Sequence, residues 1–474
     1  MAIDEKEVRE LVEEILKRLG DQQPGESRAA PMAAGVFGEI EAAVAAARAA
    51  FGKLASTSLE IRSEMIKRMR EVALENNERL ASLAVEETGL GRVAHKLFKN
   101  RLAAEKTPGI EDLEPAAYTD DYGLMLTERA PYGVIGAITP STNPTATIIC
   151  NSIGMIAAGN TVVFNAHPKA RRVSALLVSL FNQAIEKAGG PSNVLVTVEN
   201  PTIASAQALM DHPQVALLTV TGGPDIVREA LRRPKKAIVA GPGNPPAVVD
   251  ETADLEKAAE DIVAGAGLDN NIICIDEKEI LAVESIADRL KAEMLKRGAV
   301  ELTREQIERI TPQIISDPGR EGHEGAANKA FVGKDAAVIA EKTLGLTIPA
   351  ETRILLAEVD RSHPLVWTEQ LMPVIPISRF RSADEAIDFA VRCEHGFRHT
   401  ASMHSKNIER LSRMAKVMNC SLFVKNGSNF NGMASGGAGY TSYTIASPTG
   451  EGFTRPRTFT RERRCSLIGY FRIV

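Results

Sequence analysis

Apolar residues recur at helical spacing in the first 20 residues of the chain, where they are Val8, Leu11, Val12, Ile15, Leu16 and Leu19. This spacing predicts an amphipathic helix over residues 1–20 that ends at Gly20. Residues 21–35, rich in Gln, Pro, Gly, Ser and Ala, predict a flexible linker. A helix tethered in this way cannot cover its own apolar face. We therefore expect it to dock on this protein's own body, on a sister subunit or on another protein.

The pattern changes at residue 36, where the globular part of the chain begins. Helical periodicity predicts helices over residues 39–55 and 59–87. From Tyr132 onwards, short β-branched runs end in Gly, Pro, Ser or Asn, and helical patterns such as residues 173–188 lie between them. This alternation predicts an α/β protein with a parallel, doubly wound sheet. A second strand–helix series covers residues 275–424, and the tail that follows could add strands to another subunit's sheet.

Charge and composition exclude several classes of function. The chain has 56 Lys and Arg residues against 61 Asp and Glu residues, and 4% of its residues are aromatic, so we expect no nucleic-acid partner. No apolar stretch reaches 18 residues, and an acidic start replaces the basic one of a secretory signal, so we expect no membrane span and no export. The five cysteines are widely spaced and form no CxxC pair. They predict a reducing cytoplasm and no metal site.

Cys274 is the candidate nucleophile. It ends the segment GLDNNIIC, which follows a predicted helix and directly precedes a predicted strand. Loops held on a rigid scaffold often carry nucleophiles, and a cysteine attacks only as its thiolate. The alternative for any single cysteine is a small buried apolar residue, and this is the interpretation we prefer for Cys150, Cys393 and Cys420.

Two other segments end a strand and lead into a helix. In ITPSTNP, residues 138–144, the Asn143 amide could donate to an oxyanion or simply cap the helix. In VTGG, residues 220–223, backbone N–H groups could hold a pyrophosphate. The Gly/Pro segment 240–246 is either a tight turn or a close approach to a ligand, and Glu369 either orients a ribose or is solvated. We expect His399, His404 and the cluster Arg461, Arg463 and Arg464 to be satisfied or solvated polar residues.

The motifs TPSTNP, TGG, GPGNPP, NNxxC and EQLMP follow one another in this order. Together with FVKNG, SPTGEG and RTFTRERRC, they resemble the aldehyde dehydrogenase superfamily over essentially the whole chain. The resemblance is strongest to its CoA-acylating branch from bacterial microcompartments, which acts on propionaldehyde or acetaldehyde.

The resemblance implies a fold of several parts. Residues 36–240 would form a Rossmann-like domain for NAD and coenzyme A, with a small β flap near residues 108–130. Residues 241–435 would form the catalytic α/β domain, and residues 436–474 a C-terminal oligomerisation segment of a dimer or tetramer. Residues 1–20 resemble an encapsulation tag that binds a microcompartment shell protein or other cargo.

The resemblance also implies the site. It assigns Cys274 as the nucleophile and Asn143 as the oxyanion donor, with no metal. The residues that would border the NAD and CoA channel are Thr139, Pro140, Ser141, His167, Thr221, Gly222, Gly223, Gly241 and Glu369. Ala240 stands where hydrolytic members carry a water-activating glutamate, so no general base is present at that position. Asn165 stands where those members have a lysine near the adenosine ribose, and residues 426–443 match least well and could shape the aldehyde pocket.

The implied activity is oxidation of a short-chain aldehyde to acyl-CoA with NAD+ and CoA, through a thioester on Cys274, in the lumen of a bacterial microcompartment. Propionaldehyde is the preferred substrate and acetaldehyde the next. The alternatives are a hydrolytic aldehyde dehydrogenase, a semialdehyde or acyl-phosphate reductase, and a non-catalytic microcompartment scaffold. Ala240 argues against the first, the tag-like helix against the second, and the intact NNIIC and STNP segments against the third.

Overall fold

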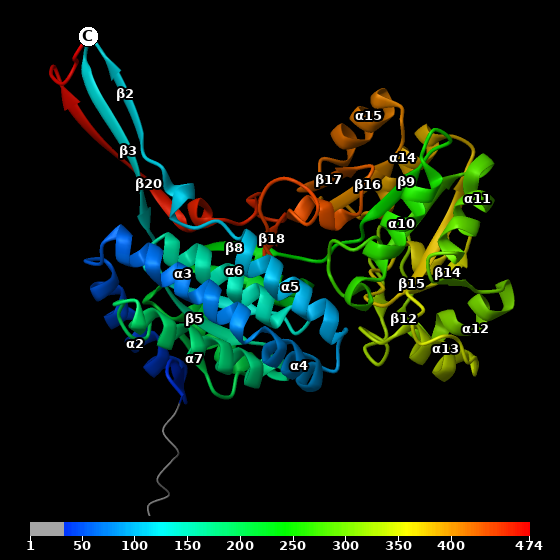
Figure 1. Ribbon diagram of the computed structural model, residues 1–474, viewed down its shortest axis with the longest axis horizontal. Helices are drawn as coiled ribbons and strands as arrows, with labels where there is room; N and C mark the ends of the chain where they lie inside the picture. Colours follow the sequence, from blue (N-terminus) through cyan, green and yellow to red (C-terminus); the bar gives the residue numbers. More distant parts are fainter. Residues whose placement is uncertain (1–32) are drawn as a thin grey trace, which may run out of the picture. The chain divides into compact units, whose positions relative to one another are not determined.

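Two parallel sheets organise the structure, a computed structural model that describes residues 33–474 (Figure 1). The predicted helix over residues 1–20 and the predicted linker up to residue 32 lie outside the described residues. The first sheet has six strands in the order β1 (Val36–Phe37), β6 (Leu195–Val198), β5 (Thr161–Ala166), β4 (Val134–Thr139), β7 (Val215–Thr221) and β8 (Lys236–Ala240). All of its neighbouring strands are parallel, which confirms the predicted sheet.

Helices cover both faces of the first sheet because successive strand residues point to opposite sides. Ile135 and Ala137 of β4 belong to one core, and Val134 and Ile138 belong to another. The first core is closed by α3 (Leu59–Glu75), α4 (Asn77–Thr88), α5 (Val93–Lys106), α6 (Pro144–Ala157) and α7 (Arg171–Lys187). The second is closed by α2 (Ile40–Leu54), α8 (Ile203–Asp211) and α9 (Pro224–Leu231). This sheet is therefore doubly wound.

The single helix predicted over residues 59–87 is two helices, α3 and α4, which separate at Asn76. Asn76 leaves the helical region with φ −99° and ψ 10°, and its Nδ2 donates to the Val72 carbonyl at 2.9 Å. Asparagine side chains compete with the backbone in this way, which the apolar periodicity could not reveal. The break lets Asn77 turn towards α5 and donate to the Leu97 carbonyl at 2.9 Å.

The second sheet has seven strands, and the chain enters it through residues 241–245. Their order is β11 (Ala299–Glu301), β14 (Ile354–Glu358), β15 (Val374–Phe380), β10 (Glu279–Val283), β9 (Pro246–Val249), β16 (Thr400–His404) and β17 (Leu422–Lys425). One face packs against α10 (Leu255–Ala266), α11 (Glu284–Leu295), α14 (Ala383–Cys393) and α15 (Ile408–Met418). The other face packs against α12 (Arg304–Ile314) and α13 (Ala336–Leu344). Adjacent strand residues Leu355 and Leu356 belong to these two different cores.

An antiparallel arm extends away from the first sheet (Figure 1). It consists of β2 (Ala116–Asp120), β3 (Gly123–Pro131) and β20 (Thr460–Ile468), with β3 in the middle. Only Thr460 of β20 is buried. Two short pairs complete the strands, β12 (Ile315–Asp317) with β13 (Ala326–Ala327) and β18 (Ile445–Ala446) with β19 (Gly452–Phe453). Within residues 33–474, no helix is both long and apolar enough to cross a membrane.

Asn160 ties the C-terminal segment to the first sheet. Its Oδ1 accepts the N–H groups of Tyr132 and Gly133 at 2.8 and 3.0 Å, and its Nδ2 donates to the Phe459 carbonyl at 2.9 Å. The side chain is fully buried, so these three hydrogen bonds replace bonds to water. They fix where the chain enters β4 and where it leaves for β20.

We predict that Asn160→Ala lowers the free energy of unfolding by about 3 kcal/mol, because several buried backbone groups lose their partner. Urea unfolding measures the loss. Asn200→Ala, which removes an exposed contact to Arg171, is the control and should change the stability by about 0.5 kcal/mol or less. Equal losses in the two variants would contradict the role given to Asn160.

Candidate active site

The site lies where edges of the two sheets meet. The carboxyl ends of β4, β5, β7 and β8 present Thr139, His167, Thr221 and Ala240 side by side, since Thr139 pairs with Ala166 and Thr221 pairs with Ala240. In the second sheet the candidate residues precede their strands instead of following them. Cys274 comes before β10, Glu369 before β15 and His399 before β16. The carboxyl edge of one sheet and the amino edge of the other therefore supply the site.

Gly243, in the crossing between the sheets, brings three of these residues together. A Cβ added there would lie 2.5 Å from the Cys274 carbonyl oxygen and 3.0 Å from the His399 ring. The Gly243 N–H donates to Glu369 Oε1 at 3.4 Å. Residues 241–245 run between β8 and β9, and at Gly243 the backbone approaches the cysteine closely.

The loop before Cys274 has an unusual backbone. Asp269, Asn270 and Asn271 have φ values of 47°, 59° and 63°, in the left-handed region that Asn and Asp tolerate best. Asn271 Nδ2 donates to the Ala266 and Glu277 carbonyls at 2.9 and 3.0 Å. The buried Lys278 ammonium donates to the Asn271 and Ile273 carbonyls at 2.6 and 3.2 Å. These bonds hold three consecutive strained residues and so fix where Cys274 stands.

Asp269 anchors this loop to the first half of the chain. Its Oδ1 accepts the Arg92 N–H at 2.9 Å, at the start of α5, where Arg92 provides no side-chain cap. Its Oδ2 accepts from the ammonium groups of Lys96, at 2.7 Å, and Lys99. Burial alone would raise the pKa of Asp269, but the charges of Lys99 and Lys96 outweigh it and lower the pKa to about 2. Burial lowers the pKa of Lys96 to about 7, and Lys99 adds to this effect.

Asn143 occupies the N-cap position of α6, yet its side chain makes no capping bond. Its Oδ1 accepts from the Lys99 ammonium at 2.6 Å, and its Nδ2 donates to Thr142 Oγ1 at 3.2 Å. The alternative of a simple helix cap is therefore not realised. One N–H of the amide is left for another acceptor.

Cys274 is half-buried, and its surroundings favour the neutral thiol. Burial, followed by the negative charge of Glu369, raises the pKa of the Cys274 thiol to about 12, whereas Lys278 opposes the shift. Burial also raises the pKa of Glu369 to about 7, so this carboxyl is not the freely solvated side chain of the alternative interpretation. The surrounding residues therefore do not favour the Cys274 thiolate, which is the form that attacks as a nucleophile.

His399 belongs to the site, although its residue type and sequence context favour a satisfied polar side chain. The imidazole is fully buried, its Nδ1 lies 2.8 Å from Thr400 Oγ1, and its Nε2 has no hydrogen-bond partner. Burial lowers the pKa of His399 to about 4, and Lys278 contributes. The expectation of a fully satisfied polar residue is wrong here. Its position directly before the segment TASMH, which forms the buried strand β16, is the signal that could have identified it.

The segments predicted to border a dinucleotide also have suitable geometry. Gly223 is the N-cap of α9, no side chain caps this helix, and nothing lies within 4 Å of a Cβ added there. A pyrophosphate fits such an open helix N-terminus. Thr221 Oγ1 lies 2.8 Å from Thr444 Oγ1, and Gly241 lies next to Pro448. The buried Thr139 hydroxyl has no partner, whereas Pro140 and Ser141 are half-buried and His167 is exposed.

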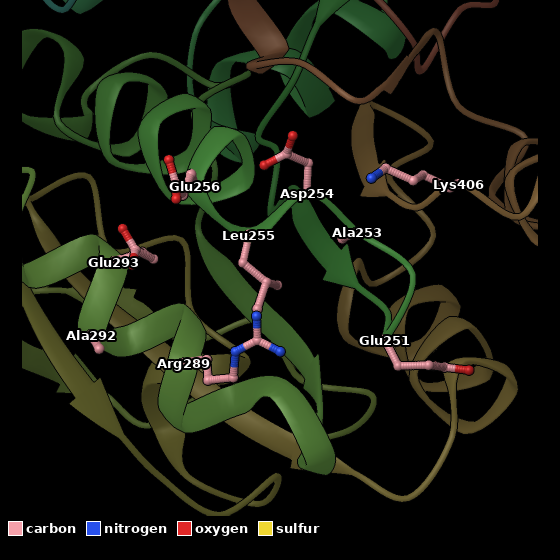
Figure 2. Close-up of a pocket in the computed structure, with 9 residues that line it drawn as sticks. All are labelled: Glu251, Ala253, Asp254, Leu255, Glu256, Arg289, Ala292, Glu293 and Lys406. Carbon is pink, nitrogen blue, oxygen red and sulfur yellow. The ribbon is translucent and has the colours of Figure 1, made fainter.

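A hollow of the surface lies elsewhere, at the start of α10, and its volume is about 520 Å³. Figure 2 shows the residues that line it, which are acidic side chains together with Arg289 and Lys406 among others. Glu251 and Lys406 in its wall follow β9 and β16, so the hollow lies at the carboxyl edge of the second sheet. None of the candidate site residues lines it. Within residues 33–474 no cluster of side chains suits a metal ion.

Glu277, three residues after the cysteine, gives a pH-dependent test of the loop. Its Oε1 accepts the Asn429 N–H at 2.8 Å, its Oε2 has no partner, and burial raises its pKa to about 8. The folded state therefore holds a proton that the unfolded state releases above its ordinary pKa of 4.5. This group makes the protein less stable as the pH rises towards 8, by about 1.4 kcal/mol per pH unit.

We predict that Glu277→Gln removes this dependence. Its stability relative to the wild type should rise by about 3 kcal/mol between about pH 5.5 and pH 7.5. Urea unfolding of both proteins at both pH values measures the change. A difference that stays constant with pH would show that Glu277 is not held protonated.

We predict that Glu369→Gln makes Cys274 react several-fold faster with iodoacetamide at about pH 8, since the thiolate loses a repelling neighbour. Mass spectrometry of the Cys274 peptide measures the rate. Glu324→Gln is the control, because Glu324 acts on Glu369 and not directly on the thiol. Equal rates in the wild type and Glu369→Gln would contradict the electrostatic link.

Comparison with known proteins identifies the family of this chain. Residues 25–451 match the model of the aldehyde dehydrogenase family. The chain is 47% identical, over the full length of both proteins, to an acetylating acetaldehyde dehydrogenase of Bilophila wadsworthia. It is 48% identical to a solved Rhodopseudomonas palustris propionaldehyde dehydrogenase with bound CoA and an acylated cysteine, with a TM-score of 0.89 over 92% of this chain and 98% of that one.

A second solved structure is a propionaldehyde dehydrogenase from the fucose utilisation microcompartment of Clostridium phytofermentans. It is 44% identical, with a TM-score of 0.90 over 93% of this chain and all of that one. The sequence motifs, the two sheets and these matches lead to one conclusion: this chain belongs to the aldehyde dehydrogenase family.

Proposed function

We propose that this chain oxidises a short-chain aldehyde to its acyl-CoA with NAD+ and CoA, through a thioester on Cys274. The observation that carries the proposal is the fixed loop that holds Cys274 beside Gly243, together with an Asn143 amide that is free to donate. Ala240 supports acyl transfer to a thiol in preference to water, because its methyl group, at the end of β8, cannot act as a base.

The reaction begins when the Cys274 thiol passes its proton to solvent water and its sulfur attacks the aldehyde carbon. The charge that develops on the aldehyde oxygen is received by Asn143 Nδ2 and the Cys274 N–H. NAD+, when bound, would supply the acceptor for the hydride that leaves this carbon, and a thioester remains on Cys274. The thiol of CoA then attacks the thioester carbon, the bond to Cys274 breaks, and acyl-CoA is released. Thiols need less activation than water for this step.

The residues around the channel take positioning roles. The open N-terminus of α9, with Thr221, Gly222 and Gly223, holds a pyrophosphate, and Glu369 orients a ribose. Thr139, Pro140, Ser141, His167 and Gly241 border the same channel. Propionaldehyde is the preferred substrate, which the segment TEQLMPVIPI favours, and acetaldehyde is the next. One methylene changes recognition by only about 1–3 kcal/mol, so both are tested.

The setting of this activity is the lumen of a bacterial microcompartment. The amphipathic pattern of residues 1–20 and the microcompartment origin of one solved relative support this proposal. Inside the microcompartment, residues 1–20 bind a shell protein or other cargo. The exposed arm of β2, β3 and β20 joins copies of the chain into a dimer or tetramer.

The experiment is NADH formation from propionaldehyde and from acetaldehyde with NAD+, with and without CoA. We expect sustained turnover only with CoA, and without CoA at most one NADH per subunit as the thioester accumulates. Cys274→Ala should lower turnover by about 10⁴-fold or more while it keeps the melting temperature near that of the wild type. Sustained turnover without CoA, with release of free acid, would favour the hydrolytic alternative. Retained activity in Cys274→Ala would contradict the nucleophile.

A further inference from the structure

We infer that Lys99 is a positioning residue for the reaction: its buried ammonium fixes the Asn143 amide with the oxygen turned away and the NH2 group turned towards the aldehyde oxygen. The inference rests on the proposed role of Asn143. It adds a residue of α5, which the sequence motifs do not include.

The contacts of Lys99 define this role. Its side chain is 1% exposed, and its ammonium donates to Asn143 Oδ1 at 2.6 Å and to Asp269 Oδ2. Lys99 lies on α5, Asn143 precedes α6, and Asp269 belongs to the cysteine loop. A single ammonium therefore joins the proposed oxyanion donor to the loop that carries the nucleophile.

The chemistry of the two groups leaves the amide one orientation. An ammonium group can only donate hydrogen bonds. It therefore binds the amide oxygen, which accepts, and repels the NH2 group. A flipped amide would place its two N–H donors against a buried cation and would turn its acceptor towards the oxyanion. Without Lys99, the remaining partner of the amide is the Thr142 hydroxyl, which can both donate and accept and therefore fits either orientation.

The charge of the cluster strengthens the same effect. Two ammonium groups, from Lys96 and Lys99, share the single carboxylate of Asp269 in a site from which water is excluded. A hydrogen bond from a cation to the amide oxygen draws electron density from the nitrogen, so its N–H becomes a better donor. The residue that orients the amide also polarises it towards a developing negative charge.

Lys96 offers a matched control within the same cluster. It lies one turn earlier on α5, is equally buried and also binds Asp269 Oδ2. Its second contact is the Thr142 backbone carbonyl, at 2.6 Å, and not the amide of Asn143. Loss of either lysine removes one charge from the same carboxylate, but only the loss of Lys99 releases the amide.

The test compares Lys99→Met, Lys96→Met, Asn143→Ala and the two double variants in the full-length protein. The first readout is the single-turnover rate of NADH formation at saturating propionaldehyde and NAD+. The second is the rate at which iodoacetamide alkylates Cys274, a reaction that forms no oxyanion. Thermal unfolding reports the damage to the fold, and Lys99→Gln, which keeps a neutral donor, takes the place of Lys99→Met if the latter does not fold.

We expect Lys99→Met to slow NADH formation by about tenfold to a hundredfold. This effect should be smaller than that of Asn143→Ala, which should slow the same reaction by about 10²-fold or more. Lys99→Met should leave the rate of Cys274 alkylation within about twofold of the wild-type rate. In the Asn143→Ala background, Lys99→Met should have no further effect, whereas Lys96→Met should keep the smaller effect that it has alone.

Two results overturn the inference. One is an effect of Lys99→Met that persists in full in the Asn143→Ala background. The other is an equal fall of NADH formation and alkylation, which a purely structural role produces. Failure of the proposed role of Asn143 is distinguishable, because Asn143→Ala would then form NADH at the wild-type rate, and failure of the proposed function itself would appear as no CoA-dependent NADH formation by the wild type.

Discussion

The carboxylate of Asp269 lies fully buried between the ammonium groups of Lys96 and Lys99, and it also accepts the N–H of Arg92, directly before α5. Removal of this carboxylate from the two ammonium groups would leave buried charges without compensation, at a cost of about 3–5 kcal/mol. The position of the cysteine loop relative to the first sheet therefore cannot drift without a large loss of stability. The strained backbone from Asp269 to Asn271 persists because these contacts hold it.

This contact at Asp269 explains how a site can form between two sheets that come from different parts of the chain. Strand ends of the first sheet supply open backbone groups, and loops before strands of the second supply the reactive side chains. Gly243 lies in the crossing between them, where the absence of a side chain allows Cys274, Glu369 and His399 to gather around one backbone position. The site therefore requires both the close packing at Gly243 and the ionic contact at Asp269.

The electrostatics around Cys274 favour neutral groups. Burial raises the pKa values of Asp276, Glu277 and Glu279 behind the cysteine and that of the thiol itself. A protonated thiol is less prone to oxidation and alkylation than a thiolate, so the resting nucleophile is protected. The positive charges of Lys96 and Lys99 instead lie towards Asn143, where negative charge develops during the reaction.

The sequence alone determined the local features of this protein. Strand–helix alternation predicted the parallel sheets, because burial of a sheet on both faces imposes a recognisable pattern, and the motif order identified Cys274 and Asn143 as candidates. The break at Asn76, the place of His399 at the site and the partners of Asn143 followed only from the tertiary structure. Asp269 follows Lys96 by 173 residues and Lys99 by 170 residues in the chain. No periodicity or spacing predicts which buried charges meet. The packing of α5 against the cysteine loop decides this pairing, since it places the lysines and the carboxylate within contact distance of each other.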